Sequence, residues 1–89
     1  MSPKEDIIHD LINKGHTKAG GIYVRVEMLL KDIRDRKNIS LRELERMTGI
    51  SKTHLNAIEL NEKEPSISIL VRIAKALNVE IKELYEVKW

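Results

Sequence analysis

The residues from Lys52 to Ala57 bring several hydrogen-bonding and small apolar side chains into one short stretch. The amine of Lys52 can donate to guanine O6 and N7, and the amide of Asn56 can make a bidentate pair with adenine. The methyl groups of Thr53 and Ala57 can pack on the methyl group of thymine. These side chains can therefore read the edges of DNA bases, provided that one surface presents them together.

The sequence offers little for catalysis or metal binding. It has no cysteine and no glycine-rich phosphate loop, and no cluster of histidines with carboxylates could serve as an acid, a base or a metal site. His9 and His16 lie in the first part of the chain and are not expected to bind a metal. We therefore predict no enzymatic activity, no metal and no cofactor.

Two short helices must hold the stretch that begins at Lys52. Ser40, followed three residues later by Glu43, is a capping box and predicts a helix that starts at Leu41. Residues at i, i+3 and i+6 of this helix are apolar and predict one buried stripe of Leu41, Leu44 and Met47.

The break between the two helices is very short. Gly49 can take the left-handed conformation that ends a helix, and Ser51 can cap the next helix, at about 51–60. Leu55 and Ile58 are the apolar positions of that second helix. Because helices joined by so tight a turn cross at a large angle, the leading face of the second helix stays uncovered.

With these features the sequence resembles the phage-repressor and Cro-type helix-turn-helix family, also called the XRE family. The resemblance runs from about Met28 to Tyr85 and depends on a set of short motifs in a fixed order: Ile33-Arg34, Ile39-Ser40, Glu43-Leu44, Gly49-Ile50-Ser51, Ile58-Glu59, Pro65-Ser66, Leu70, Ile73-Ala74, Ala76-Leu77 and Glu83-Leu84. Each motif alone is weak, but the whole set is specific. It implies an all-α, five-helix lambda-repressor-like DNA-binding bundle.

The resemblance also implies roles for single residues. It puts four residues at the DNA bases: Lys52, Thr53, Asn56 and Ala57. It implies phosphate contacts for Arg42, His54 and Lys63, and an internal ion pair between Arg34 and Glu59. The competing interpretation is that the four base-reading candidates form only a solvated helix face, and that His54 is only surface exposed.

Four residues depart from the family pattern. Leu41 replaces a frequent glutamine, and Glu45 replaces the usual alanine beside the turn, where its carboxylate must point to solvent or pair with a neighbouring arginine. Glu62 and Glu64 flank Lys63 and weaken the positive field of that loop. These departures favour an alternative function as a protein-binding or antitoxin-like module.

The chain before the resemblance predicts a separate extension. Ser2-Pro3-Lys4-Glu5 is typical of a helix start, and an apolar stripe follows at Ile7, Ile8, Leu11 and Ile12. This extra N-terminal helix can pack on its own domain, contact a partner, or fray. Residues 16–21 predict a linker. The predicted division is therefore 1–21 for the extension and linker, and 22–89 for the helix-turn-helix domain.

The segments that flank the bundle alternate apolar and polar residues. This pattern predicts a strand at 22–26 and a second one at 85–89, which could pair as a small two-stranded ribbon. The alternative is one long helix over residues 22–37.

Length and charge limit the class of protein. Eighty-nine residues allow one small domain, and a net charge of +2 says little about partners, so charge distribution matters more. Between Arg34 and Lys63 seven residues are basic and five are acidic. No apolar run approaches the roughly 20 residues that span a bilayer, so we predict a cytoplasmic protein with no membrane partner.

We predict a sequence-specific transcriptional regulator, a repressor, that binds double-stranded DNA as a homodimer without a small-molecule ligand. A two-fold dimer doubles the number of bases read and requires a palindromic operator, with half-sites roughly 10 base pairs apart.

Overall fold

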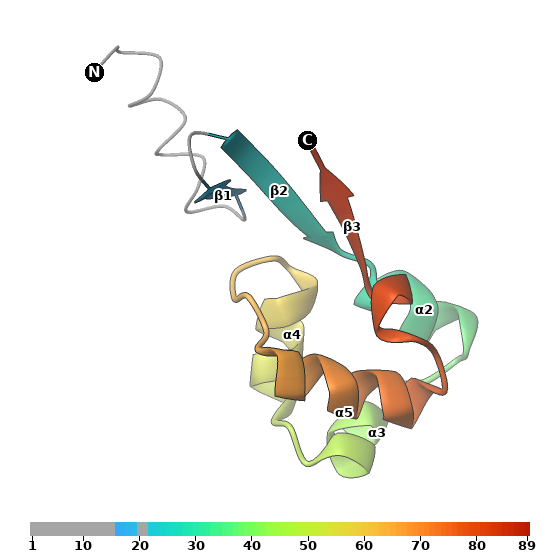
Figure 1. Cartoon of the computed structure of the whole chain (residues 1–89). Helices are drawn as coiled ribbons and strands as arrows, with labels where there is room; N and C mark the ends of the chain where they lie inside the picture. The colour runs from blue at the N-terminus through green and yellow to red at the C-terminus, as the bar shows by residue number, and fades with distance from the viewer. Residues whose placement is uncertain (1–15, 20–21) are drawn as a thin grey trace.

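The computed structural model describes residues 16–19 and 22–89, with side chains from residue 23 onward. Two strands come first, β1 (His16–Ala19) and β2 (Ile22–Met28). Four helices follow: α2 (Leu30–Arg36), α3 (Leu41–Thr48), α4 (Lys52–Glu59) and α5 (Ile67–Leu77). The 3₁₀ helix η1 (Ile81–Glu83) leads into strand β3 (Tyr85–Lys88). The helices gather into one bundle, and β2 and β3 project from it side by side (Figure 1).

Serine caps start three of the helices, and left-handed residues end two of them. The hydroxyls of Ser40, Ser51 and Ser66 accept hydrogen bonds from backbone N–H groups at the starts of α3, α4 and α5. Gly49, with φ of 76°, ends α3, and Asn78, with φ of 57°, ends α5. The predicted start of α3 at Leu41 and its end at Gly49 are confirmed.

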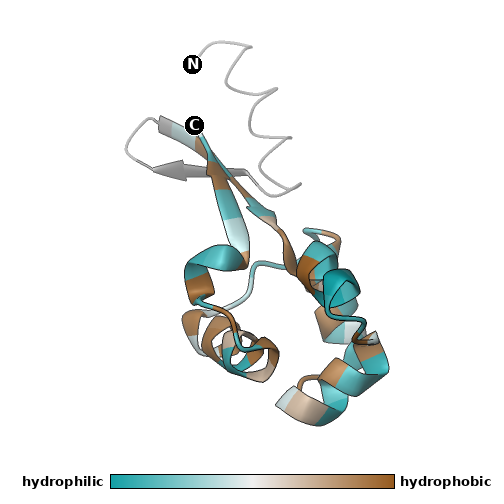
Figure 2. Ribbon diagram, turned by 90° about the vertical axis from the view of Figure 1, so that its right-hand side faces the viewer, coloured by the Kyte–Doolittle hydropathy of each residue, from teal (hydrophilic) through white to brown (hydrophobic). Residues whose placement is uncertain are grey.

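The core is aliphatic and draws on α2, α3, α4 and α5. Its buried side chains are Leu30, Ile33, Leu44, Ile50, Leu55, Ile58, Ile73, Ala74, Leu77 and Leu84. Removing one such leucine or isoleucine from water contributes roughly 1.5–3 kcal/mol, so this cluster is the main stabilising feature of the bundle. Hydrophobic and polar residues alternate along the helices (Figure 2).

The buried face of α3 differs from the predicted stripe. Leu44 is fully buried and Leu41 packs against the core, but Met47 is 47% exposed and Thr48 is buried in its place. The reason is the helical period of about 3.6 residues. Thr48, seven residues after Leu41, lies on the same face of the helix as Leu41, whereas Met47, six residues after it, does not. The prediction was therefore wrong for Met47.

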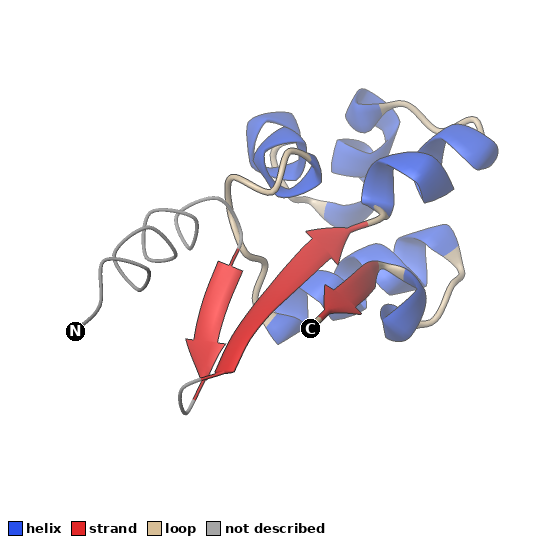
Figure 3. Cartoon of the chain, turned by 90° about the horizontal axis from the view of Figure 1, so that it is seen from above, coloured by secondary structure: helices blue, strands red, loops and turns tan. Residues whose placement is uncertain are grey.

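A small antiparallel sheet with strand order β1-β2-β3 flanks the bundle (Figure 3). Val26 lies opposite Val87, and Met28 lies opposite Tyr85. The predicted ribbon between the two ends of the domain is thus confirmed, and the alternative of one helix over 22–37 is wrong. The helix α2 starts only at Leu30 because β2 continues to Met28.

Two other sequence predictions need correction. Residues 16–21 were expected to form a linker, but His16–Ala19 form β1 and pair with β2. Composition alone misses such pairing, because any backbone can offer N–H and C=O groups to a neighbouring strand. The fifth helix of the bundle is only the 3₁₀ turn Ile81–Glu83, so residues 30–84 contain four α-helices. The extra N-terminal helix lies outside the described residues.

Candidate nucleic-acid interface

One face of α4 packs against the core, and the opposite face is open to solvent. Leu55 and Ile58 are fully buried beneath it, and Ile50 anchors the turn that precedes it. Lys52, Thr53 and Asn56 are exposed, and Ala57 is partly buried beside them. Across residues 23–89, the side chains of Lys52, Thr53 and Asn56 make no hydrogen bond or ion pair. The four candidate base contacts therefore share one helix, with their polar groups free.

Two side chains cap the first turn of α4, and neither belongs to the open face of that helix. Ser51 Oγ accepts from the His54 N–H at 3.1 Å, and Glu45 Oε2 accepts from the Lys52 N–H at 2.9 Å. The expectation that Glu45 points to solvent or pairs with an arginine was wrong. A free N–H group and the positive end of the helix dipole both attract a carboxylate, so Glu45 joins α3 to the start of α4.

The turn between α3 and α4 is fixed by contacts that the sequence did not reveal. Thr48 Oγ1 donates to the Leu44 carbonyl at 2.8 Å and accepts from the Ile50 N–H at 3.1 Å. The Arg72 guanidinium, on α5, donates to the Thr48 carbonyl. A Cβ added at Gly49 would lie 3.1 Å from Arg72 Nη2, so the turn has little room for a side chain there.

An ion pair joins the far end of α4 to α2. Arg34 Nε lies 2.7 Å from Glu59 Oε2, and a second guanidinium nitrogen donates to Glu59 Oε1 at 3.3 Å. The side chains are only 11% and 3% exposed. Hydrogen bonding to Glu59 raises the pKa of Arg34 above its usual value. This bidentate contact fixes the direction of α4 relative to α2.

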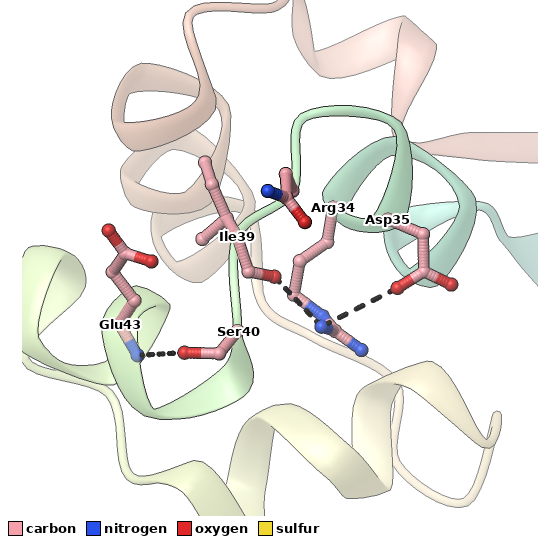
Figure 4. A pocket seen from close by; sticks show the side chains of 6 residues that line it. Arg34, Asp35, Ile39, Ser40 and Glu43 are labelled. Atoms are coloured by element: carbon pink, nitrogen blue, oxygen red, sulfur yellow. Dashed lines mark hydrogen bonds and ion pairs between the residues drawn. The ribbon is translucent and has the colours of Figure 1, made fainter.

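Arg34 also lines a shallow surface pocket with Asp35, Asn38, Ile39, Ser40 and Glu43 (Figure 4). A guanidinium nitrogen of Arg34 donates to the Ile39 carbonyl at 2.8 Å, and Asp35 Oδ1 lies 3.6 Å from the same nitrogen. Ser40 and Glu43 are joined by the cap of α3. The Arg34 guanidinium, the Asp35 carboxylate and the Ser40 hydroxyl thus have partners within the bundle.

The three candidate phosphate contacts lie around α4 in the chain. Arg42 is exposed in the first turn of α3, His54 is partly buried in α4, and Lys63 is exposed in the loop that follows α4. This loop folds back on the end of α4, because the N–H groups of Glu62 and Lys63 both donate to the Ala57 carbonyl, at 2.9 and 3.3 Å. Arg42 thus precedes the open helix in the chain, His54 lies on it, and Lys63 follows it.

The described residues include neither a grouped set of metal ligands nor a membrane-spanning helix. Within residues 16–19 and 22–89, no three His, Cys, Asp or Glu side chains are grouped so that they could hold a metal ion. In the same part of the chain, every helix is too short or too polar to cross a lipid bilayer.

Comparison with known proteins gives consistent matches to regulators. The transcriptional regulator SutR of Escherichia coli is 44% identical over 50 residues, which are 56% of this chain but only 28% of SutR. Control protein C.SmaI of Serratia marcescens is 31% identical over 61 residues, which are 65% of this chain and 73% of that protein. The chain thus spans less than a third of SutR but most of the small control protein.

Solved structures share the fold. The clp gene regulator ClgR of Corynebacterium glutamicum superimposes with a TM-score of 0.58 at 30% identity, covering 61% of this chain and 70% of ClgR. The controller protein C.AhdI of Aeromonas hydrophila gives a TM-score of 0.59 at 24% identity, over 61% of this chain and 82% of C.AhdI, and shows the fold alone. The helix-turn-helix family model HTH_3 matches residues 30–84, from the start of α2 to the last core leucine. The chain therefore belongs to this helix-turn-helix family of DNA-binding transcriptional regulators.

Proposed function

We propose that this chain is a sequence-specific repressor that places α4 in the major groove of a palindromic operator. The observation that carries the proposal is the open face of α4, where the side chains of Lys52, Thr53 and Asn56 are exposed and have no hydrogen-bond or ion-pair partner in the described part of the chain. A helix-turn-helix protein presents to DNA a helix that follows a tight turn and packs against the domain on one face only.

Each exposed side chain has a role in this proposal. Lys52 donates to guanine, Asn56 pairs with adenine, and the methyl groups of Thr53 and Ala57 contact thymine. A good bidentate pair discriminates against the wrong base by roughly 1–3 kcal/mol. Because α4 is held at both ends, by Glu45 and by Arg34, the direction of the helix that carries these four side chains is fixed relative to α2 and α3.

Phosphate contacts then set the position of the domain on the duplex. Arg42, His54 and Lys63 are the proposed donors, and such contacts add affinity that falls with salt but do not read sequence. A single module of this size reads few base pairs, so we propose a cytoplasmic homodimer with half-sites roughly 10 base pairs apart. The names of SutR, C.SmaI and ClgR, as regulators or control proteins, support a regulatory role.

The test is selection of bound sequences from a random DNA pool by the purified protein, at two salt concentrations. We expect a palindrome with half-sites one helical turn apart, and we expect Lys52→Ala combined with Asn56→Ala to abolish its enrichment. Lys82→Ala, which removes an exposed lysine from η1, is the control and should leave the motif unchanged. Failure to enrich any motif at low salt would refute the proposal.

A second candidate function is binding to another protein as an antitoxin-like module. Three carboxylates favour it, because Glu45 of α3 contacts the start of α4, and Glu62 and Glu64 are exposed beside Lys63. They reduce the positive potential that DNA would meet. Absence of an enriched DNA motif in the same selection would favour this function.

A further inference from the structure

The two faces of the ribbon formed by β2 and β3 differ in polarity. On one face Arg25 pairs with Glu27 at 2.8 Å, and Lys88 pairs with Glu86 at 3.1 Å. Because side chains alternate along a strand, the residues between these charges point to the opposite face. That face, the apolar sheet face, consists of Val24, Val26, Met28, Tyr85, Val87 and Trp89.

The bundle covers only one end of the apolar sheet face. Met28 packs against the hydrophobic core, but the ribbon projects away from the bundle beyond this residue (Figure 1). Farther out, Val87 lies opposite Val26 and is 36% exposed, and Trp89 is 89% exposed. A sheet with one apolar face normally buries that face against another element. The outer part of this face thus continues the core and is open among the described residues.

We propose that residues 3–14 form an amphipathic helix that packs on the apolar sheet face of the same chain. These residues lie outside the described part of the chain, and the sequence predicts the helix and its apolar stripe at Ile7, Ile8, Leu11 and Ile12. Packing on its own domain is one of the three possibilities that the sequence leaves open for this helix. The inference does not depend on the proposed function.

The connection to β1 leads the chain to this face. Residue 15 directly precedes His16, which lies opposite Arg25 of β2. The strand β2 runs toward the bundle and β1 is antiparallel to it, so β1 begins at its end nearest the bundle. A helix joined to β1 by a short loop at Gly15 folds back along the sheet. Its first residues then lie far from the bundle, at the level of Trp89.

The dimensions of the helix match those of the ribbon. Twelve helical residues extend about 18 Å, and the seven residues of β2 extend about 20 Å. A helix with its side chains is about 10–12 Å across, more than twice the roughly 4.8 Å between neighbouring strands. One helix is therefore long enough and wide enough to cover β2 and β3 together.

The spacing of the apolar residues also matches. Ile8 and Ile12 are separated by about 6 Å along a helix, and Val24 and Val26 by about 6.6 Å along β2. The last turn of the helix, next to β1, then meets the row of Val26. The turn before it meets the row of Val24. Both rows of the apolar sheet face thus receive apolar side chains from the stripe.

Amide hydrogen exchange of the full chain tests the packing from the side of the helix. A helix of this length is marginal alone in water, so slow exchange at residues 7–12 requires packing. Leu11→Gln keeps helix propensity and removes the apolar contact. We expect it to speed exchange at residues 7–12 about tenfold or more. Asn13→Gln introduces the same residue on the opposite side of the predicted helix, and this control should leave exchange slow.

The same measurement tests the packing from the side of the sheet. Val87→Ser removes an apolar side chain from the apolar sheet face, and we expect exchange at residues 7–12 to become about fivefold faster or more. Glu86→Ser changes the charged face of the same strand and should have no such effect. Unchanged exchange at Leu44 and Leu55 shows that the bundle remains folded in each variant.

A cross-link tests which residues meet. The chain has no cysteine, so Leu11→Cys combined with Val26→Cys introduces one pair of thiols. A disulfide requires the two Cα atoms to lie within about 7 Å. We expect this pair to close within one chain about tenfold faster than Asn13→Cys combined with Val26→Cys, whose tether has nearly the same length.

Several outcomes would overturn the inference. Fast exchange at residues 7–12 in the unmodified chain would show that the apolar sheet face has a different occupant. Equal effects of Leu11→Gln and Asn13→Gln, or equal rates for the two cross-links, would show that the stripe does not face the sheet. A disulfide that links two chains would show that the helix packs on a second copy. None of these outcomes bears on the DNA selection, so the proposed function is tested separately.

Discussion

Arg34 and Glu59 place two opposite charges where α2 meets the end of α4. Removing two ions from water costs several kcal/mol each, and their attraction offsets this only when the geometry is good and other hydrogen bonds are satisfied. Both conditions hold, because the guanidinium contacts both carboxylate oxygens and also the Ile39 carbonyl. Such a pair adds little net stability, but either partner alone would be a buried, uncompensated charge.

We therefore expect the single changes Arg34→Met and Glu59→Leu each to lower the free energy of unfolding by about 3–5 kcal/mol. The double variant should lose much less, since it leaves no charge buried. Urea unfolding of the three variants measures the difference. Lys31→Ala is the control, because it breaks only the exposed pair with Asp35 and should change stability little. A double variant as unstable as the singles would contradict this account.

Of the contacts that fix the turn between α3 and α4, the sequence predicts those between residues a few positions apart and misses those between distant residues. The serine caps and the left-handed Gly49 could be predicted, because each depends on backbone within a few positions. The contact between Arg72 and Thr48 could not, since it joins residues 24 apart and depends on how α5 crosses α3. The role of Glu45 was missed for the same reason, because the turn brings Lys52 back to it.

At the scale of elements, α4 depends on its cap from α3. Ser51 and Glu45 each accept from one of the first N–H groups, which would otherwise lack a partner. The contact from Glu45 comes from a different helix, so it stabilises both α4 and the angle between the two helices.

We expect Glu45→Ala to lower the free energy of unfolding by about 0.5–2 kcal/mol, the usual loss for a helix cap. Glu45→Gln keeps an acceptor oxygen and should lose less than Glu45→Ala. Thermal unfolding compares the two, with Glu62→Ala as the control for removal of an exposed carboxylate. Equal stability of Glu45→Ala and the unmodified chain would show that water caps α4 equally well.

Helices and strands with a regular sequence pattern were predicted well. Elements that form only through pairing with another strand were predicted less well. Alternation at both ends of the domain predicted the ribbon of β2 and β3, and family spacing predicted the helices of the bundle. The strand β1 was missed, because its residues resemble a linker and become a strand only through pairing with β2. The last helix shortened to a 3₁₀ turn, since the chain must leave the bundle there and enter β3.

At the scale of the whole molecule, hydrogen bonds mark the place where the sheet meets the bundle. The Leu29 N–H donates to the Leu84 carbonyl at 2.8 Å, and the Met28 N–H donates to Asn61 Oδ1 at 3.0 Å. Asn61 has φ of 59°, in the loop just after α4. A residue next to the proposed reading helix thus also holds the end of β2.

We expect Asn61→Gly to lower the free energy of unfolding by about 1 kcal/mol, because glycine accepts the left-handed backbone but loses the hydrogen bond. Asn61→Ala should cost about 1–2 kcal/mol more, since alanine is strained there. Asn78→Gly is the matched control, with φ of 57° and no side-chain hydrogen bond within residues 23–89. Urea unfolding should rank the control as most stable and Asn61→Ala as least stable.

The caps of α4 have a consequence for how this domain can change over generations. Ser51 and Glu45 hold the start of the helix, and Arg34 with Glu59 holds its end, so the exposed side chains of Lys52, Thr53 and Asn56 take no part in these contacts. Lys52, Thr53 and Asn56 can therefore be exchanged for other residues at small thermodynamic cost. Binding preference can drift, or be redesigned, while the scaffold beneath it remains constant.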